Sequence, residues 1–163
     1  MKITVINTGG TFNKRYNPIK GTLDVPSDHI ALEKIVASCH NVEFEIKDII
    51  SKDSLEIDDN DRKIITQSVR ESKNKNIIII HGTDTVDLTS AYLQKEINDK
   101  KIVFTGAMVP MSIEEVEATM NFSLALGFLS SNDPNGIYIA MHGVVVEHTK
   151  LKKNKSVGKF LVN

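Results

Sequence analysis

The sequence has 163 residues, the length of one ordinary domain and short for an enzyme built from two domains. Its 20 basic and 21 acidic side chains give a formal net charge of −1, which argues against nucleic acid as a partner. The apolar run at the N-terminus is too short for a signal peptide and no stretch reaches membrane-spanning length, so we expect a cytoplasmic protein without a membrane partner.

The chain alternates short β-branched runs with segments of helical periodicity. Continuously apolar or β-branched runs typical of strands occupy residues 3–7, 42–46, 76–81, 101–106 and 136–146. Apolar positions at helical spacing lie between them, within 32–39, 64–69, 86–97 and 114–130. This alternation predicts a single α/β domain with a mostly parallel sheet.

The least regular segment, residues 12–27, follows directly on the first predicted strand. It contains two prolines, a glycine and few periodic apolar positions. We therefore expect a long loop there, and loops of that length are usually functional or disordered.

Small, hydroxylated and glycine-rich sequences follow three of the predicted strands. They are "TGGT" (8–11), "HGTDT" (81–85) and "TGAM" (105–108). In an open parallel sheet, ligands bind outside the carboxyl ends of the strands. The three motifs together therefore indicate a binding or catalytic site at that edge.

Each motif also has a purely structural interpretation. Adjacent glycines permit a tight turn with positive φ, and Asp84 is well placed to cap the helix that follows it. Ser112 with Glu115 matches a capping box. His81, at a strand end, fits a hydrogen-bonded structural histidine better than a base. The residues alone leave these alternatives open.

The chemistry of the first motif points away from phosphate binding. It lacks the Gly-Lys-Ser/Thr of a P-loop and the third spaced glycine of a dinucleotide fingerprint. A threonine hydroxyl is a poor nucleophile unless a base lies close, and Thr83, Asp84 and a lysine are the candidate partners. A lysine serves as a base where burial or a neighbouring cation lowers its pKa. The histidines show no metal-ligand spacing, so we expect no cofactor.

The order and spacing of "TGGT", "IIHGTDT" and "TGAMVP" closely resemble the bacterial-type L-asparaginases and glutaminases, through essentially the whole chain. The resemblance implies a doubly wound, mainly parallel α/β sheet with helices on both faces. It assigns residues 1–163 to a domain like the family's N-terminal, catalytic one, with the family's C-terminal domain absent from this chain. It also implies a homo-oligomer, because the family assembles through this domain.

The resemblance further implies roles for individual residues. Thr11 matches the family's nucleophilic threonine, and Thr83 and Asp84 match the pair that works with a lysine in proton transfer. Ser54, in "KDSLEID", resembles the serine that holds the substrate's α-carboxylate. The implied substrate-binding residues are Gly10, Ser54, Gly82, Ala107 and, as a candidate for the loop tyrosine, Tyr16.

The site lysine is placed by counting from Met141, since in the family it follows the corresponding methionine by twelve residues. That count reaches Lys153, and Lys152 or Lys150 if the loop differs in length. Two departures from the family stand nearby: Val109 replaces a common arginine, and the segment before the lysine lacks the family's Asp-Gly-Arg.

The implied activity is hydrolysis of a small side-chain amide through a threonine acyl-enzyme. Backbone N–H groups near the first turn would stabilise the oxyanion, ammonia would leave, and water would release the acid. The absence of the family's C-terminal domain from this chain favours an alternative, in which the chain is a catalytically weak or inactive domain. In that case it keeps the pocket for binding a small molecule or for assembly.

Overall fold

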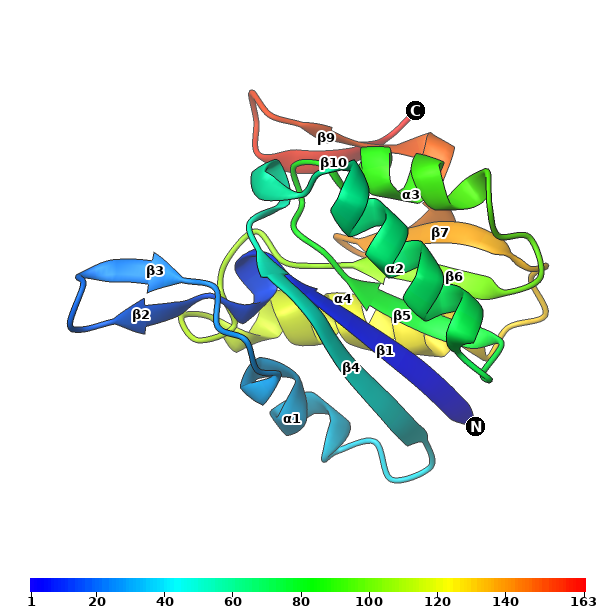
Figure 1. Cartoon of the computed structure of the whole chain (residues 1–163), viewed down its shortest axis with the longest axis horizontal. Helices are drawn as coiled ribbons and strands as arrows, with labels where there is room; N and C mark the ends of the chain where they lie inside the picture. Colours follow the sequence, from blue (N-terminus) through cyan, green and yellow to red (C-terminus); the bar gives the residue numbers. More distant parts are fainter.

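The computed structural model describes all 163 residues and shows a central sheet between two layers of helices (Figure 1). The strand order is β4-β1-β5-β6-β7-β8, with β8 alone antiparallel to its neighbour. The predicted mainly parallel α/β sheet is therefore confirmed. Its strands are β1 (Lys2–Gly9), β4 (Glu43–Lys52), β5 (Asn76–Ile80), β6 (Lys101–Thr105), β7 (Gly136–Met141) and β8 (Val144–Glu147).

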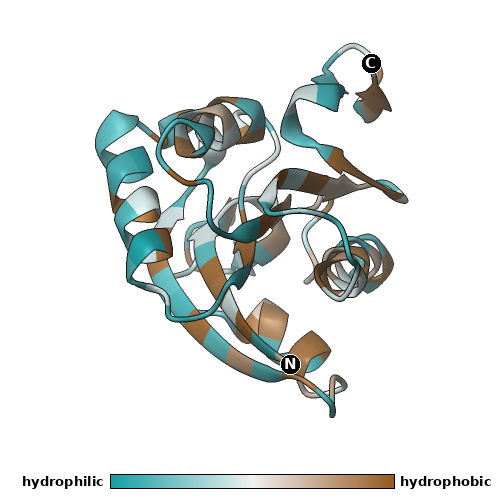
Figure 2. Ribbon diagram, turned by 90° about the vertical axis from the view of Figure 1, so that its right-hand side faces the viewer, coloured by the Kyte–Doolittle hydropathy of each residue, from teal (hydrophilic) through white to brown (hydrophobic).

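Helices cover both faces of the sheet, as Figure 2 shows in a view turned by 90°. Successive side chains of a strand point to opposite faces, so Ile78 and Ile80 of β5 enter one core while Ile77 and Ile79 enter the other. This explains why the run "NIIII" is apolar throughout. The first core includes α1 (Ile30–Val36) and α4 (Glu115–Leu129), and the second includes α2 (Asp59–Glu71) and α3 (Val86–Gln94).

None of these helices combines the length and the apolar character needed to cross a bilayer.

The cap of α4 differs from the sequence-based expectation. Glu114, not Ser112, precedes the helix, and its carboxylate accepts the N–H groups of Val116 and Glu117. The Ser112 hydroxyl instead donates to the backbone carbonyl of Lys14 at 2.7 Å, so it tethers the segment after the first strand.

The predicted single strand over 136–146 is wrong, because the chain reverses at His142 and Gly143. Both residues have positive φ, 51° and 90°, as a two-residue type I′ hairpin turn requires. β7 and β8 then pair antiparallel on either side of the turn. Apolar residues continue on both sides of this histidine and glycine, which is why periodicity did not reveal the turn.

The segment 12–27 contains short regular structure instead of a continuous loop. It holds most of the 3-10 turn η1 (Thr11–Asn13), and the strands β2 (Arg15–Asn17) and β3 (Thr22–Asp24) of a hairpin that projects from the body of the fold (Figure 1). Arg15 forms two hydrogen bonds with the carboxylate of Asp28, at 3.0 and 2.7 Å. These bonds lower the pKa of Asp28 and fasten the base of the hairpin ahead of α1.

A second hairpin lies near the C-terminus of the chain. The 3-10 turn η3 (His148–Lys150) leads into β9 (Leu151–Asn154), which pairs antiparallel with β10 (Lys159–Val162). Leu151 and Phe160 are buried in the core that contains α2 and α3. This hairpin is therefore outside the main sheet but is held against it by two apolar side chains.

Reciprocal hydrogen bonds close the N-terminus of α2. The Asp58 carboxylate accepts the N–H groups of Asn60 and Asp61, at 2.8 and 2.9 Å, and the Asp61 carboxylate accepts the N–H of Asp58 at 3.0 Å. Lys52, the last residue of β4, also donates to Asp61 at 2.7 Å. The cap thus fixes both ends of the short connection that contains Ser54.

Removing this cap should destabilise the domain. We expect Asp58→Ala to lower the free energy of unfolding by about 1 kcal/mol, because two N–H groups lose their acceptor. Asp58→Asn keeps an acceptor oxygen and should cost much less. Urea denaturation of the two variants measures the difference, and equal losses would show that the negative charge, not the cap, matters.

Candidate functional site

Three segments touch at the carboxyl ends of β1, β4 and β5. Gly10, with φ of 74°, follows β1, and a Cβ on it would lie only 2.5 Å from the backbone nitrogen of Gly82. A Cβ on Gly82 would in turn lie 2.7 Å from the Ser54 hydroxyl oxygen. Any side chain at either position would collide, so both glycines are needed for the close approach of these backbones.

Ser54 links the connection after β4 to the "HGTDT" segment. It is the first residue of the 3-10 turn η2 (Ser54–Glu56) and is buried. Its hydroxyl oxygen accepts the N–H of Asp84 at 3.1 Å, and its backbone carbonyl accepts the hydroxyl of Thr85 at 2.7 Å. The structure thus brings together Ser54, Gly82 and Asp84, all of which were predicted site residues.

Lys153 reaches the same segment from β9. Its Nζ donates to the Thr83 Oγ1 and to the Asp84 Oδ1, both at 2.8 Å, and its side chain is only 13% exposed. Lys150 pairs instead with Glu147, and Lys152 is exposed. Of the three candidate lysines, Lys153 is the one that contacts the predicted partners.

The capping interpretation of Asp84 is wrong. α3 begins at Val86 after Thr85, and no side chain accepts a hydrogen bond from the N-terminal N–H groups of this helix. The Asp84 carboxylate faces the ammonium group of Lys153 instead. Its negative charge therefore pairs with a lysine of the β9–β10 hairpin.

Thr11 lies on the segment after β1, and Ala107 lies on a further segment of this edge. Thr11 is half-buried and follows Gly10 directly, next to the contact between Gly10 and Gly82. Ala107 is buried in the connection between β6 and α4. The backbone carbonyl of Phe12 accepts the N–H of Met111 at 3.3 Å, which joins the two segments.

Tyr16 does not belong to this cluster in the structure. It lies on β2 of the projecting hairpin, and 64% of its surface is exposed. The predicted site residues thus divide into a contacting group at the sheet edge, Thr11 and Ala107 on segments beside that group, and one tyrosine on a separate hairpin.

Lys14 and Asp53 are charged neighbours of the site that the sequence analysis missed. The Lys14 Nζ donates to the Asp53 carboxylate at 2.6 Å. Burial raises the pKa of Asp53, but the hydrogen bonds from Lys14 and from the Leu55 N–H, together with the charges of Lys14 and Lys153, lower it overall. Their positions, three residues after Thr11 and directly before Ser54, were the only signal in the sequence.

His81 has the properties of a structural histidine. It is 1% exposed, its Nδ1 donates to the Gly82 carbonyl at 2.8 Å, and its ring packs edge-on against Phe104. Burial lowers its pKa from the usual 6.5 to about 4. The ring is therefore neutral near pH 7, and it supports the Gly82 backbone from inside the fold.

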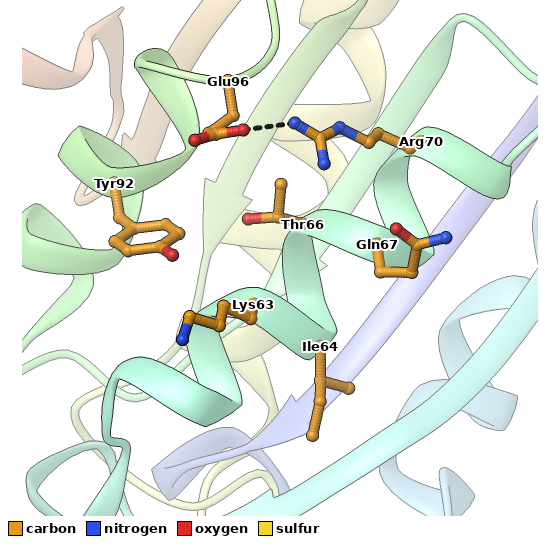
Figure 3. Close-up of a pocket in the computed structure, with 7 residues that line it drawn as sticks. All are labelled: Lys63, Ile64, Thr66, Gln67, Arg70, Tyr92 and Glu96. Atoms are coloured by element: carbon orange, nitrogen blue, oxygen red, sulfur yellow. Dashed lines mark hydrogen bonds and ion pairs between the residues drawn. The ribbon is translucent and has the colours of Figure 1, made fainter.

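A hollow of about 300 Å³ opens where the start of α3 faces the β9–β10 hairpin, and Thr83, Asp84 and Lys153 line it. A larger hollow of about 510 Å³ lies between α2 and α3, where Arg70 pairs with Glu96 (Figure 3). None of the predicted site residues lines the larger hollow. No group of three or more His, Cys, Asp or Glu side chains is arranged to hold a metal ion.

Comparison with known proteins agrees with this arrangement of motifs. The family model described as "Asparaginase, N-terminal" matches residues 2–159. The chain belongs to the asparaginase family. Over 162 residues it is 31% identical to the L-asparaginase of Thermococcus kodakarensis, a match that covers 97% of this chain and 49% of that protein. It is 28% identical over 153 residues to a glutamyl-tRNA(Gln) amidotransferase subunit of Nanoarchaeum equitans, a match that covers 90% of this chain and 38% of that one.

Solved structures support the same family fold. The thermostable L-asparaginase of T. kodakarensis superposes with a TM-score of 0.86 at 29% identity, over 99% of this chain and 51% of that chain. A probable cytoplasmic L-asparaginase from Campylobacter jejuni superposes with a TM-score of 0.80 at 23% identity, over 99% and 51%, which is a likeness of fold. This asparaginase-family chain thus spans about half the length of these relatives.

His81 should make the stability of this asparaginase-family domain depend on pH. Between pH 6.5 and pH 4 the unfolded histidine binds a proton that the folded one, with a pKa of about 4, does not bind. The free energy of unfolding should therefore fall by about 3 kcal/mol from this group as the pH drops from 7 to 4.

Urea denaturation across this pH range, with wild type, His81→Asn and the exposed-site control His40→Asn, measures the effect. The His81→Asn variant should lose this part of the pH dependence, whereas His40→Asn should keep it. An unchanged pH dependence in His81→Asn would show that other groups cause it.

Proposed function

We propose that this domain provides the catalytic site of an asparaginase-like amidohydrolase, which cleaves a small side-chain amide with Thr11 as the nucleophile. The observation that carries the proposal is the contact of Lys153 with both Thr83 and Asp84, 2.8 Å from each. It lies at the sheet edge where Gly10, directly before Thr11, meets Gly82. Membership of the asparaginase family supports amide hydrolysis, and asparagine is the first substrate to test.

In the proposed reaction the Thr11 hydroxyl oxygen attacks the amide carbon, and its proton passes to the group formed by Thr83, Lys153 and Asp84. Backbone N–H groups at the turn stabilise the oxyanion that forms. The carbon–nitrogen bond then breaks, the nitrogen takes up a proton, and ammonia leaves an ester on Thr11. Water attacks this ester, releases the acid and returns the proton to Thr11.

In this proposal the proton released in the reaction is transferred by three side chains, those of Thr83, Lys153 and Asp84. Because Lys153 donates to the Thr83 oxygen, the Thr83 hydroxyl keeps its own proton available for a partner in the site. The Asp84 carboxylate orients the lysine and balances its charge. The three groups thus form a continuous hydrogen-bonded path for proton transfer.

Ser54 is proposed to hold the substrate, with Gly10, Gly82 and Ala107 supplying the surrounding backbone surface. The Ser54 oxygen accepts the Asp84 N–H, so its hydroxyl proton remains free to donate to a substrate carboxylate. Tyr16 would join only if the β2–β3 hairpin bends toward the sheet edge.

A binding or assembly domain with little turnover is the second candidate function. Val109 in place of the family's arginine favours it, and so does the absence of the Asp-Gly-Arg before the lysine. The similarity to amidotransferase subunits also favours a part in a larger assembly. This function predicts ligand binding at the same edge without release of ammonia.

Substitution of Thr11 is the direct test of the nucleophile. Wild-type protein should release ammonia from asparagine, glutamine or another member of a small-amide panel. Thr11→Ala should reduce the rate by about a thousandfold or more, because the attacking group is gone. Thr119→Ala, a control on α4, should keep the rate. Release that survives in Thr11→Ala would refute the assignment, and no release from any amide would favour the binding domain.

The lysine assignment has its own matched test. Lys153→Met should lower kcat by about a hundredfold through loss of the proton path, while the exposed Lys159→Met, on the same hairpin, should change it little. Steady-state kinetics of ammonia release measures both variants. Equal effects of the two changes would mean that the hairpin's overall charge, not the Lys153 contact, matters.

We also propose that the domain forms a homo-oligomer, and that the α4 patch takes part in the contact. The patch consists of exposed apolar side chains on α4 and on the connection before it, namely Val109, Ile113, Val116 and Met120. Several exposed apolar residues on a helix and on the connection that leads into it favour a contact with another molecule. A second copy of the chain would bury them.

Sedimentation velocity at micromolar concentration tests the oligomer. Wild type should sediment as a dimer or larger, and Val116→Asp should shift it toward the monomer. Val157→Asp, an exposed valine in the β9–β10 turn, serves as the control. A wild-type monomer at this concentration would contradict the proposal.

A further inference from the structure

Two side chains of α4 fix the connection between β6 and α4. The Glu117 carboxylate accepts the N–H groups of Met108 and Val109, at 2.9 and 3.0 Å. The Asn121 side-chain amide donates to the Gly106 carbonyl at 3.0 Å. The backbone on both sides of Ala107, a proposed substrate-binding residue, is therefore held by the helix.

The same two side chains also hold His142 in the turn between β7 and β8. The Asn121 side-chain oxygen accepts the N–H of His142 at 3.0 Å, and the Glu117 Oε1 lies 3.1 Å from the His142 Nε2. His142 is the one non-glycine residue with positive φ. Such a conformation persists where surrounding contacts determine it, as these do.

The far side of the His142 ring faces the β9–β10 hairpin. Its Nδ1 accepts the N–H of Phe160 at 3.4 Å, and the two rings meet edge to face with centroids 5.8 Å apart. Because Nδ1 accepts, a neutral ring carries its proton on Nε2 and donates it to Glu117. His142 thus contacts α4 with one ring nitrogen and β10 with the other.

Phe160 is paired with Lys153 across the hairpin. The contacts therefore run without a break from the Ala107 connection, through α4 and His142, to the strand position opposite the site lysine. A two-stranded hairpin is marginally stable by itself, so its placement depends on the few side chains that dock it. His142 adds a polar contact to the apolar docking of Leu151 and Phe160.

We propose that His142 is a positioning residue, which sets the β9–β10 hairpin, and with it Lys153, relative to the connection that carries Ala107. The effect of His142 on catalysis rests on the proposed function. Its effect on the placement of the β9–β10 hairpin rests on the contacts alone. A misplacement of about 1 Å in a catalytic group costs as much as a hundredfold in rate, so small movements of this hairpin matter.

Hydrogen exchange tests the coupling without any assay of activity. His142→Gly removes the imidazole at a position whose φ of 51° suits glycine, so the backbone is not strained by the change. The amides of β9 and β10, Phe160 above all, should exchange about three- to tenfold faster than in wild type. His40→Gly, an exposed loop histidine, should leave them unchanged. Equal exchange in wild type and His142→Gly would overturn the proposal.

Kinetics then separates positioning from a merely structural contact. His142→Gly should lower kcat for ammonia release about tenfold or more while KM stays within about twofold. His142→Asn, which tolerates the left-handed backbone and carries both donor and acceptor atoms, should restore much of the loss. Faster exchange with unchanged kcat would refute the positioning role. If wild type releases no ammonia, the proposed function fails, and the exchange result still decides the coupling.

Discussion

The close approach of the Gly10 and Gly82 backbones is the constraint on which this site depends. Parallel strands place their carboxyl ends at one edge of the sheet, but side chains normally keep the following segments apart. Here two positions without a Cβ let the segments after β1 and β5 touch, and Ser54 closes the group from β4. The hydroxyl and carboxylate side chains of the motifs lie close together because the backbone segments that carry them are in direct contact.

A second layer of interactions lies behind this contact. The neutral, buried His81 supports Gly82 from within, and the capped start of α2 fixes the connection that carries Ser54. Lys153, by contrast, lies on a strand outside the main sheet. The rigid part of the site is thus built by the sheet and its helices, whereas its cation is supplied by a separately docked hairpin.

Much of this architecture was predictable from the sequence, for identifiable physical reasons. Both faces of the sheet are covered, so central strands such as "NIIII" are apolar throughout, and the helices show their own spacing. The family resemblance, through its spacing from Met141, implied Lys153, which the structure places against Thr83 and Asp84. The catalytic and binding roles of these residues remain predictions.

Other features were beyond sequence reasoning. The turn at His142 and Gly143 was missed because apolar residues continue across it without a change of period. The Lys14–Asp53 pair joins residues 39 positions apart, and a single sequence shows no sign of such a pairing. The residues alone left Asp84 open to a role as a helix cap, because a carboxylate before a helix fits that pattern, whereas the family resemblance paired it with a lysine, and the structure shows the lysine contact.

The lysine contact also has a consequence for how the site can open. Lys153 comes from a hairpin outside the main sheet, so the contacts among Gly10, Gly82 and Ser54 do not depend on it. Local opening of the β9–β10 hairpin would separate the lysine from Thr83 and Asp84 without unfolding the sheet.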